Sequence, residues 1–471
     1  MALGKARKNQ QSSLWVETRQ LEAHGPHPFY SEVNRILEKH RFDARAEQLC
    51  RKYYADGVGR PSLPPGTYFR CYFLGYFDGL DSERGIAYRL ADSLSARQFL
   101  GLSWEQRTPD HSTLSKTRRL LSLGTHKALF DWMLLLLAKE GMILGQTVGI
   151  DATTLEANAA LKSLVRRQDG ASYDEHIAQL MKTEGLEAPT AEQRARFDRK
   201  RKKKSLSNRD WVNPHDPQAR ITQLKDGRTH LAYKAEHVVD FEGGAILAVT
   251  VQPGDRGDSQ SMHPSLCAAM SAVAEMAGRK ANPDAVGQIA QVAWSGSDRV
   301  VGDKGYHSKQ GVWILRQADI RTVIAEPDRG RQRWSGQEGE QEAVYANRRC
   351  VKSEGGKALL RKRGEYLERT FAHVYNTGGM RRVHLRGRDN IAKRLLIHVA
   401  AFNLSLILRK RCGAGTARQA ADLRRALYAW FLLLDRAFHP DAATLALFTI
   451  LDLACSPLNS AVQKDALSTG C

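Results

Sequence analysis

VGIDATTLEANAA at residues 148–160 and VVGDKGYHS at residues 300–308 are the segments that decide the fold. In each, a short apolar run typical of a buried strand reaches a carboxylate, Asp151 or Asp303, where we expect the chain to leave the sheet. Small residues follow Asp151 and leave room around its side chain. Because a buried strand rarely ends on a charge without a reason, both aspartates are candidates for chemistry.

Five β-type runs set the order of the elements. They are TVGID, LAYKAEHVVD, AILAVTVQ, RVVGD and TVIAE, at residues 147–151, 231–240, 245–252, 299–303 and 322–326. FEGG predicts a hairpin between the second and third runs, and helices fit at 263–276 and 309–317. The order β-β-β-α-β-α-β with a following helix predicts an α/β fold with an RNase H-like core, a five-stranded mixed sheet flanked by helices. In that order the first and fourth strands are parallel neighbours, so Asp151 and Asp303 are expected side by side.

Two carboxylates that close disfavour their own ionised state unless a cation lies between them. Oxygen ligands without a His or Cys cluster favour Mg²⁺, for which Mn²⁺ can substitute. A third carboxylate is expected from the helix at 361–379, one face of which carries Arg361, Glu365, Glu368, Ala372 and Tyr375. A surface salt bridge is the competing interpretation of Glu368, but the order Asp, Asp, Glu on these elements favours a ligand. The pattern leaves Glu365 open as the alternative.

The chain divides into three expected domains. Residues 1–140 predict a helical N-terminal domain, 145–410 the RNase H-like domain, and 411–471 a helical C-terminal extension. Within the second, residues 162–228 form a polar insert that carries the basic block DRKRKKKS. Such a block is either a solvated, mobile segment or an element that contacts DNA.

Charge points to a polyanionic partner. The 71 Lys and Arg against 51 Asp and Glu give a formal net charge of +20, which favours nucleic acid first and an anionic membrane second. The apolar stretches fall short of the roughly 18 residues of a membrane span, and no apolar segment follows the basic start, so we expect no membrane partner. The expected location is the cytoplasm, in association with the nucleoid. Seven scattered cysteines without a CxxC pair predict neither a disulfide framework nor a zinc site.

At these residues the chain resembles the DDE transposases of bacterial insertion sequences. The resemblance rests on VGIDATTLEANAA, YKAEHVVD, VVGDKGYHS and the segment from ERTFAHV to LSLIL, which ends at Leu408. SERGIAYRLADSLSARQFLGL and TPDHSTLSKTRR also resemble the family's first domain, which is associated with recognising element ends.

This resemblance implies that Asp151, Asp303 and Glu368 are the catalytic residues and hold two Mg²⁺ ions. The implied reaction is cleavage at the ends of the insertion sequence followed by strand transfer into target DNA, as in cut-and-paste transposition. The implied partners are double-stranded DNA, both terminal inverted repeats and target, and a second copy of the chain at least while two ends are held together. Two other interpretations stay open: an inactive DNA-binding regulator derived from a transposase, and an RNase H-like nuclease that cuts without joining.

The expected DNA contacts depart from the family pattern at one point. Many relatives place a Tyr seven residues and an Arg four residues before the glutamate, where this chain has Arg361 and Gly364. That leaves the phosphate-contacting roles and any hairpin-forming route unassigned, with Arg361, Arg363 and Arg369 as substitutes. The predicted DNA-binding residues are Lys116, Arg118, Arg119, Trp334, Arg361, Arg369, Arg381 and Arg382. A solvated helix surface and a packed loop tryptophan are the alternatives for the first three and for Trp334, and His237, His307 and His373 are expected to be structural.

Overall fold

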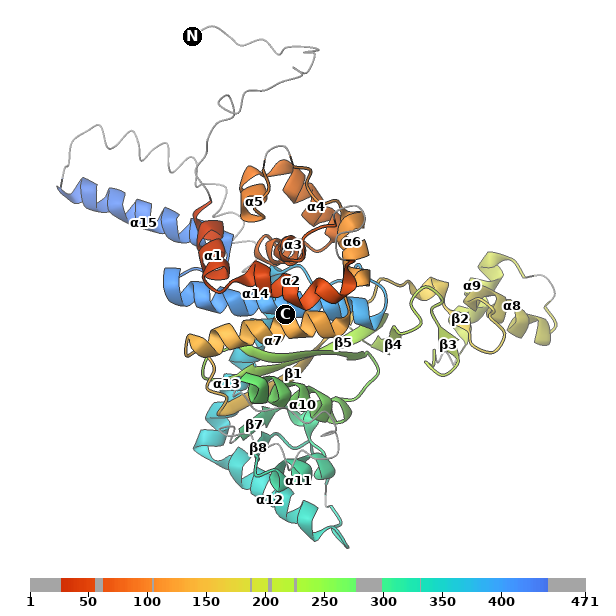
Figure 1. The fold of residues 1–471 in the computed structure, drawn as a ribbon. Helices are drawn as coiled ribbons and strands as arrows, with labels where there is room; N and C mark the ends of the chain where they lie inside the picture. The colour runs from red at the N-terminus through yellow and green to blue at the C-terminus, as the bar shows by residue number, and fades with distance from the viewer. Residues whose placement is uncertain are drawn as a thin grey trace, which may run out of the picture. The chain divides into compact units, whose positions relative to one another are not determined.

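The computed structural model describes residues 27–55, 62–103, 106–186, 189–201, 206–223, 227–276, 299–330 and 332–438. The chain forms two compact units, Met1–Ile407 and Leu408–Cys471. The first contains a group of helices and one mixed sheet (Figure 1). A mixed sheet flanked by helices, a helical N-terminal region and a long C-terminal helix confirm the predicted fold class.

The N-terminal helices surround an almost wholly apolar one. They are α1 Pro28–Lys39, α2 Phe42–Cys50, the 3₁₀ turn η2 Arg51–Tyr53, α3 Pro65–Phe77, α4 Glu83–Asp92, α5 Leu94–Phe99, α6 His111–Leu120 and α7 Leu123–Lys139. Every residue of α3 from Tyr68 to Phe77 is buried, so α3 is the centre of this packing. The side chains of Ser82, Ser93, Asp110 and Ser122 each accept a backbone N–H at the start of the following helix, which fixes where α4 to α7 begin.

All five predicted strands are present in one sheet. They are β1 Thr147–Glu156, β5 Thr229–Asp240, β6 Ile246–Pro253, β7 Arg299–Gly302 and β8 Arg321–Ile324. The short strand β4 Arg220–Gln223 is added, and the sheet order is β4-β5-β1-β7-β8, with β6 also paired to β5. β1 runs antiparallel to β5 and parallel to β7, while β7 runs parallel to β8.

Strand β1 is longer than the sequence predicts. It was expected to end at Asp151 but continues to Glu156, paired with β5 from Val148 to its last residue. ATTLE contains two β-branched threonines and lies beside a long partner strand, so cross-strand pairing extends β1 beyond its apolar run. Asp151 therefore lies inside a strand instead of where the chain leaves the sheet.

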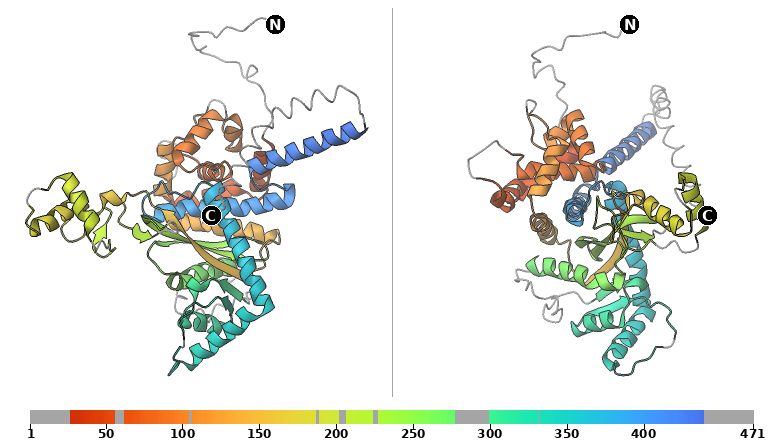
Figure 2. Two further views of the ribbon diagram at one scale, coloured as in Figure 1. Left: turned by 180° about the vertical axis from the view of Figure 1, so that it is seen from behind. Right: turned by 90° about the vertical axis from the view of Figure 1, so that its right-hand side faces the viewer.

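Helices cover both faces of the sheet. α10 Asp258–Met276 packs on β5 and β6, and α13 Glu354–Phe371 packs on β1, β5, β7 and β8. α11 Lys309–Gln317 and α12 Glu338–Lys352 pack around β8; they are the teal and cyan helices of Figure 2. After α13 the chain widens into a π-helix, η7 Ala372–Thr377. The change in residues per turn rotates Tyr375 into the interior, so the predicted exposed face holds only as far as Ala372.

Helix α14 Arg388–Cys412 protects the open side of β6. The side-chain amide of Asn403 accepts from the N–H of Ile246 at 3.0 Å and donates to its carbonyl at 2.9 Å, which pairs backbone groups of an edge strand. Within the described residues, the stretch Arg388–Leu434 is long and apolar enough to cross a membrane, but 89% of its apolar window is buried. The bent pair of α6 and α7 passes the same test only when taken together. α14 thus has the burial of a core helix.

The insert after β1 has its own small structure. It contains η3 Leu161–Ser163, the paired strands β2 Val165–Arg166 and β3 Trp211–Val212, and the packed helices α8 Tyr173–Thr183 and α9 Ala191–Lys200. Four residues of the basic block, 202–205, lie outside the described residues. The second unit contains α15 Ala417–Phe438.

Candidate active site

The structure brings Asp151 and Asp303 to neighbouring strands, as expected. The parallel ladder of β1 and β7 runs from Thr147↔Arg299 to Gly149↔Val301, and each aspartate lies two residues beyond its last paired position. They are close enough for the negative charge of Asp303 to contribute to a rise in the pKa of Asp151. Two chain segments about 150 residues apart thus form one acidic edge of the sheet.

Asp151 is partly enclosed, with 23% of its side chain exposed. Its Oδ1 accepts from the N–H of Ala152 and its Oδ2 accepts from Nη1 of Arg363, both at 2.8 Å. Burial raises the pKa of Asp151, the two donors lower it, and Asp303 raises it further. The effect of burial on the pKa outweighs that of the two donors, so the ionised form of Asp151 is disfavoured unless a further cation lies close to it.

A tight turn holds Asp303. The residue begins the 3₁₀ helix η6 Lys304–Tyr306, and its Oδ1 accepts from the N–H of Gly305 at 2.8 Å. A Cβ on Gly305 would lie 2.2 Å from Oδ2 of Asp258 and 3.1 Å from Oδ1 of Asp303. A side chain at this position would displace the carboxylate of Asp258, so glycine lets Asp258, at the start of α10, approach the acidic edge.

A buried polar network anchors this turn on the α10 side of the sheet. The hydroxyls of Tyr306 and Ser261 each donate to Oε1 of Glu236 at 2.8 Å. Nζ of Lys234 lies 3.4 Å from the same oxygen and 2.5 Å from Oδ1 of Asp258. Burial, with Glu236 nearby, raises the pKa of Tyr306 far above its ordinary value, so Tyr306 stays a donor. The sequence signal for this network is the alternation of Lys234 and Glu236 in an otherwise apolar strand, which sequence reasoning missed.

Helix α13 presents Arg363, not Glu368, to Asp151. Arg363, Leu367 and Thr370 recur at helical spacing on the side facing the sheet, and the latter two are buried. The side chain of Glu368 is exposed and forms no hydrogen bond or ion pair with any residue that the structure describes, whereas the side chain of Glu365 pairs with Arg369. No three His, Cys, Asp or Glu side chains converge on a metal-sized site within the described ranges. In the structure Asp151 and Asp303 therefore lie close together, but Glu368, the third predicted ligand, does not lie with them.

The donors present nevertheless suit a divalent cation. Two carboxylates lie close enough to interact electrostatically at a partly buried edge, and a cationic group, the guanidinium of Arg363, is bound to one of them. Carboxylate oxygens are the ligands that Mg²⁺ and Mn²⁺ take in proteins. Asp151 and Asp303 would hold such an ion, and Glu368 would join them only after α13 moves.

Histidines near the site are mostly structural, as predicted. His237 is fully buried, with ring nitrogens 3.2 Å from Oγ1 of Thr370 and 2.7 Å from the hydroxyl of Tyr375. Burial lowers the pKa of His237 to about 3, so the ring is neutral. The ring of His373 packs near Phe402, at 6.0 Å between centroids. His307 is buried too, but neither of its ring nitrogens has a hydrogen-bond partner in the described part of the chain.

The predicted DNA contacts differ in exposure. Lys116, Arg119, Arg361, Arg369, Arg381 and Arg382 are exposed. Arg118 is only 5% exposed, and its Nε lies 3.2 Å from Oε1 of Glu83, because it is on the side of α6 that packs against α4. Arg118 is therefore a buried ion-pair partner and not a surface contact for phosphate. Trp334 is half-buried, with Nζ of Lys309 4.1 Å from its ring centre, which favours the packed-loop alternative.

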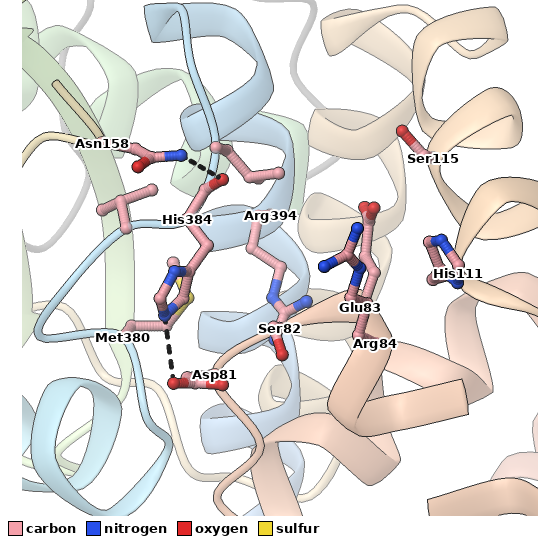
Figure 3. A pocket seen from close by; sticks show the side chains of 12 residues that line it. Asp81, Ser82, Glu83, Arg84, His111, Ser115, Asn158, Met380, His384 and Arg394 are labelled. Carbon is pink, nitrogen blue, oxygen red and sulfur yellow. Dashed lines mark hydrogen bonds and ion pairs between the residues drawn. The ribbon is translucent and has the colours of Figure 1, made fainter. Parts of the chain in front are cut away.

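A cavity of about 590 Å³ separates the N-terminal helices from the segment that precedes α14 (Figure 3). On one side Nε2 of His384 lies 3.1 Å from Oδ2 of Asp81, and the side-chain amide of Asn158 donates to the carbonyl of His384 at 3.1 Å. His111 and Ser115 of α6 lie on the opposite side, with Arg394 and Arg84 between. The polar lining and the exposed Arg381 and Arg382 nearby make this face suitable for a polyanion.

Comparison with known proteins agrees with this geometry. A transposase domain model (DUF772) matches residues 17–120, and a transposase DDE domain model matches residues 209–404. The second match includes Asp303 and Glu368 and begins after Asp151. No curated protein matches the chain. The two matches together span more than half of the chain; the first lies in its helical N-terminal region and the second includes Asp303 and the sheet strands from β5 onward. The chain therefore belongs to the DDE transposases of insertion sequences, a family of phosphoryl-transfer enzymes.

Proposed function

We propose that this chain cleaves DNA at the ends of its own insertion sequence and joins the freed 3′ ends to target DNA, by cut-and-paste transposition. The observation that carries the proposal is the pair Asp151 and Asp303 on adjacent parallel strands, in a chain of a transposase family. Glu368 is the third catalytic residue in this proposal. The terminal inverted repeats and target DNA are the substrates, two copies of the chain act together, and the reaction takes place in the cytoplasm at the nucleoid.

In this proposal some side chains bind metal and others hold the metal ligands in place. Asp151 and Asp303 bind Mg²⁺, or Mn²⁺ in its place, and the N–H of Gly305 restrains the side chain of Asp303. Two such ions, when bound, activate the attacking oxygen and stabilise the leaving oxygen of an in-line phosphoryl displacement. The buried network of Glu236 and Tyr306 holds the turn that carries Asp303. Since the carboxylates serve as ligands, no covalent bond between protein and DNA is required.

Substitution of each acidic residue tests the proposal. We expect Asp151→Asn, Asp303→Asn and Glu368→Gln to abolish both cleavage and joining while DNA binding persists, because the side chains bind metal and not DNA. Glu365→Gln is the matched control on the same helix, since Glu365 pairs with Arg369 at the surface. The measurement is the mapping of nicks and joined products on duplexes from the borders of the gene, with Mg²⁺.

Each outcome assigns a function. Cleavage without joined products would replace the proposal with an RNase H-like nuclease, and binding without cleavage by the intact chain would replace it with a DNA-binding regulator. Retained cleavage in Asp151→Asn would remove Asp151 from the site. Loss in Glu365→Gln with activity in Glu368→Gln would exchange the roles of the two glutamates.

The basic surface gives a second test. Lys116 and Arg119 are exposed on α6, and Arg381 and Arg382 are exposed in the segment before α14. If each contacts a phosphate, its replacement by Gln weakens binding of all sequences alike and lowers the slope of log affinity against log salt by about one. Titrations at several salt concentrations measure this slope, and an unchanged slope in all four variants would place the DNA elsewhere.

A further inference from the structure

The ion pair between Arg363 and Asp151 is the only cationic contact that Asp151 makes among the described residues. It joins α13 to β1 across 212 positions of sequence, with Nη1 of Arg363 2.8 Å from Oδ2 of Asp151. The exposed fractions are 18% for the Arg363 side chain and 23% for Asp151. Partial burial of both groups reduces screening by solvent, so this pair is stronger than an ordinary surface ion pair.

Each oxygen of Asp151 already accepts one hydrogen bond, and one of the two donors is cationic. Oδ1 of Asp151 accepts from the N–H of Ala152, and Oδ2 accepts from Arg363. A divalent cation at Oδ2 would meet a guanidinium at hydrogen-bond distance, and two like charges so close repel strongly in a half-buried site. Arg363 and the metal therefore compete for this carboxylate.

The same contact fixes the rotation of α13. Arg363 binds Asp151, Leu367 is fully buried beside Gly149, and the hydroxyl of Thr370 lies 3.2 Å from Nδ1 of His237. With this side of the helix held on the sheet, Glu368 stays exposed. Release of Arg363 would thus favour both metal binding at Asp151 and the approach of Glu368.

We propose that Arg363 competes with the divalent metal for Asp151, and that an anion, the phosphate of bound DNA, frees Asp151 by taking over the guanidinium. The inference rests on the proposed function, in which Asp151 is a metal ligand. A guanidinium recognises phosphate as well as it recognises carboxylate, through paired hydrogen bonds. Exposed Arg361 and Arg369 on the same helix extend the positive surface to which such a phosphate is drawn. After the exchange Arg363 is paired with phosphate and Asp151 with the metal, so neither charge is left without a partner.

Metal binding in the absence of DNA tests the competition without any catalytic readout. Mn²⁺ is titrated into the full chain by calorimetry, with Arg363→Gln, Arg361→Gln and Asp151→Asn beside the unchanged chain. We expect Arg363→Gln to bind Mn²⁺ about tenfold more tightly, which corresponds to the loss of a partly buried like charge. Arg361→Gln removes the same charge from the same helix at an exposed position and is expected to change the affinity less than about twofold. Asp151→Asn should lose the site.

The outcomes separate this inference from the proposed function. Equal or weaker Mn²⁺ binding in Arg363→Gln, with loss in Asp151→Asn, overturns the competition and leaves the metal site intact. Unchanged binding in Asp151→Asn removes Asp151 as a ligand, and the proposed site fails with it. An equal increase in Mn²⁺ affinity in Arg363→Gln and Arg361→Gln would show that only the net charge matters, and this result would also overturn the inference. Arg363→Met, which keeps the aliphatic stem of the side chain, replaces the glutamine variant if circular dichroism shows that the latter does not fold.

Discussion

Gly149 shows how closely single residues pack at the acidic edge of the sheet. A Cβ at this position of β1 would lie 2.3 Å from Cε1 of Phe241 and 3.2 Å from Cδ1 of Leu367, and both of these side chains are fully buried. Gly364 of α13 is the opposite case, because a Cβ there would meet nothing within 4 Å. Two glycines in contacting elements therefore have opposite steric surroundings.

Alanine at the two positions should change stability in opposite directions. Gly149→Ala forces Phe241 to move and is expected to lower the free energy of unfolding by about 1–3 kcal/mol. Gly364→Ala removes backbone freedom from a helix interior and is expected to raise it by about 0.5–1 kcal/mol. Urea unfolding followed by circular dichroism measures both. An unchanged free energy of unfolding in Gly149→Ala would mean that Phe241 has space to move.

At this scale the sequence predicted the acids better than their partners. Asp151 and Asp303 stand out because each follows an apolar run, which is a local signal. The contact of Arg363 with Asp151 depends on the rotation of a helix more than 200 residues away in sequence, and no local pattern encodes it. Arg118 failed as a DNA contact for a related reason: its basic neighbours Lys116 and Arg119 are exposed, but its own direction on α6 faces Glu83.

Among the elements, four helices meet at a buried group of charges. Oε1 of Glu83 on α4 accepts from the hydroxyl of Tyr72 on α3 at 2.6 Å and lies 3.2 Å from Nε of Arg118 on α6. Arg394 of α14 lies over the ring of Tyr72, 4.8 Å from its centre, and is 2% exposed. The carboxylate of Glu83 thus pairs with one buried guanidinium, that of Arg118, and lies close enough to a second, that of Arg394, to favour its charge.

Removal of that carboxylate should destabilise the helices strongly. Glu83→Gln leaves Arg118 buried without an anion and is expected to cost about 3–5 kcal/mol. Glu32→Gln is the matched control, because Glu32 pairs with Arg35, whose side chain is 66% exposed, and such a pair contributes less than about 1 kcal/mol. Thermal unfolding of both variants gives the comparison. Equal melting temperatures would show that solvent reaches Arg118.

The bounds of an element were predicted correctly where a local sequence signal, such as a capping residue, sets them. α11 has the predicted bounds, Lys309–Gln317, since Ser308 caps its start. β1 exceeds its prediction because its last five residues owe their conformation to pairing with β5, a contact of long range. The π-helix η7 likewise has no signal in the periodicity, and it turned Tyr375 away from the predicted face and onto His237.

Over the whole molecule, buried neutral histidines make stability depend on pH. Burial lowers the pKa of His126 to about 4 and the pKa values of His237 and His398 to about 3, and all three side chains are fully buried. The unfolded chain takes up these protons near pH 6.5 and the folded chain does not, so this stability is present above pH 6.5 and is lost as pH falls toward 3. Asp240, whose pKa burial raises to about 7, acts in the opposite sense.

The midpoint of urea unfolding should therefore fall as pH is lowered from 6.5 to 5. Each histidine contributes up to about 1.4 kcal/mol per pH unit, and Asp240 offsets about one of the three. His398→Gln removes one titrating group and should make the dependence shallower. A midpoint that does not change between pH 6.5 and 5, or the same slope in His398→Gln, would contradict the assignment.

The parallel pairing of β1 with β7 also has a consequence for synthesis of the protein. A ribosome makes Asp151 well before Asp303, and β7 must leave the exit tunnel before β1 has its parallel neighbour. Until then the nascent chain contains the N-terminal helices and Asp151, but not Asp303. A product truncated before Arg299 would retain the exposed Lys116 and Arg119 of α6 without Asp303, so under the proposed function such a product binds DNA but does not cleave it.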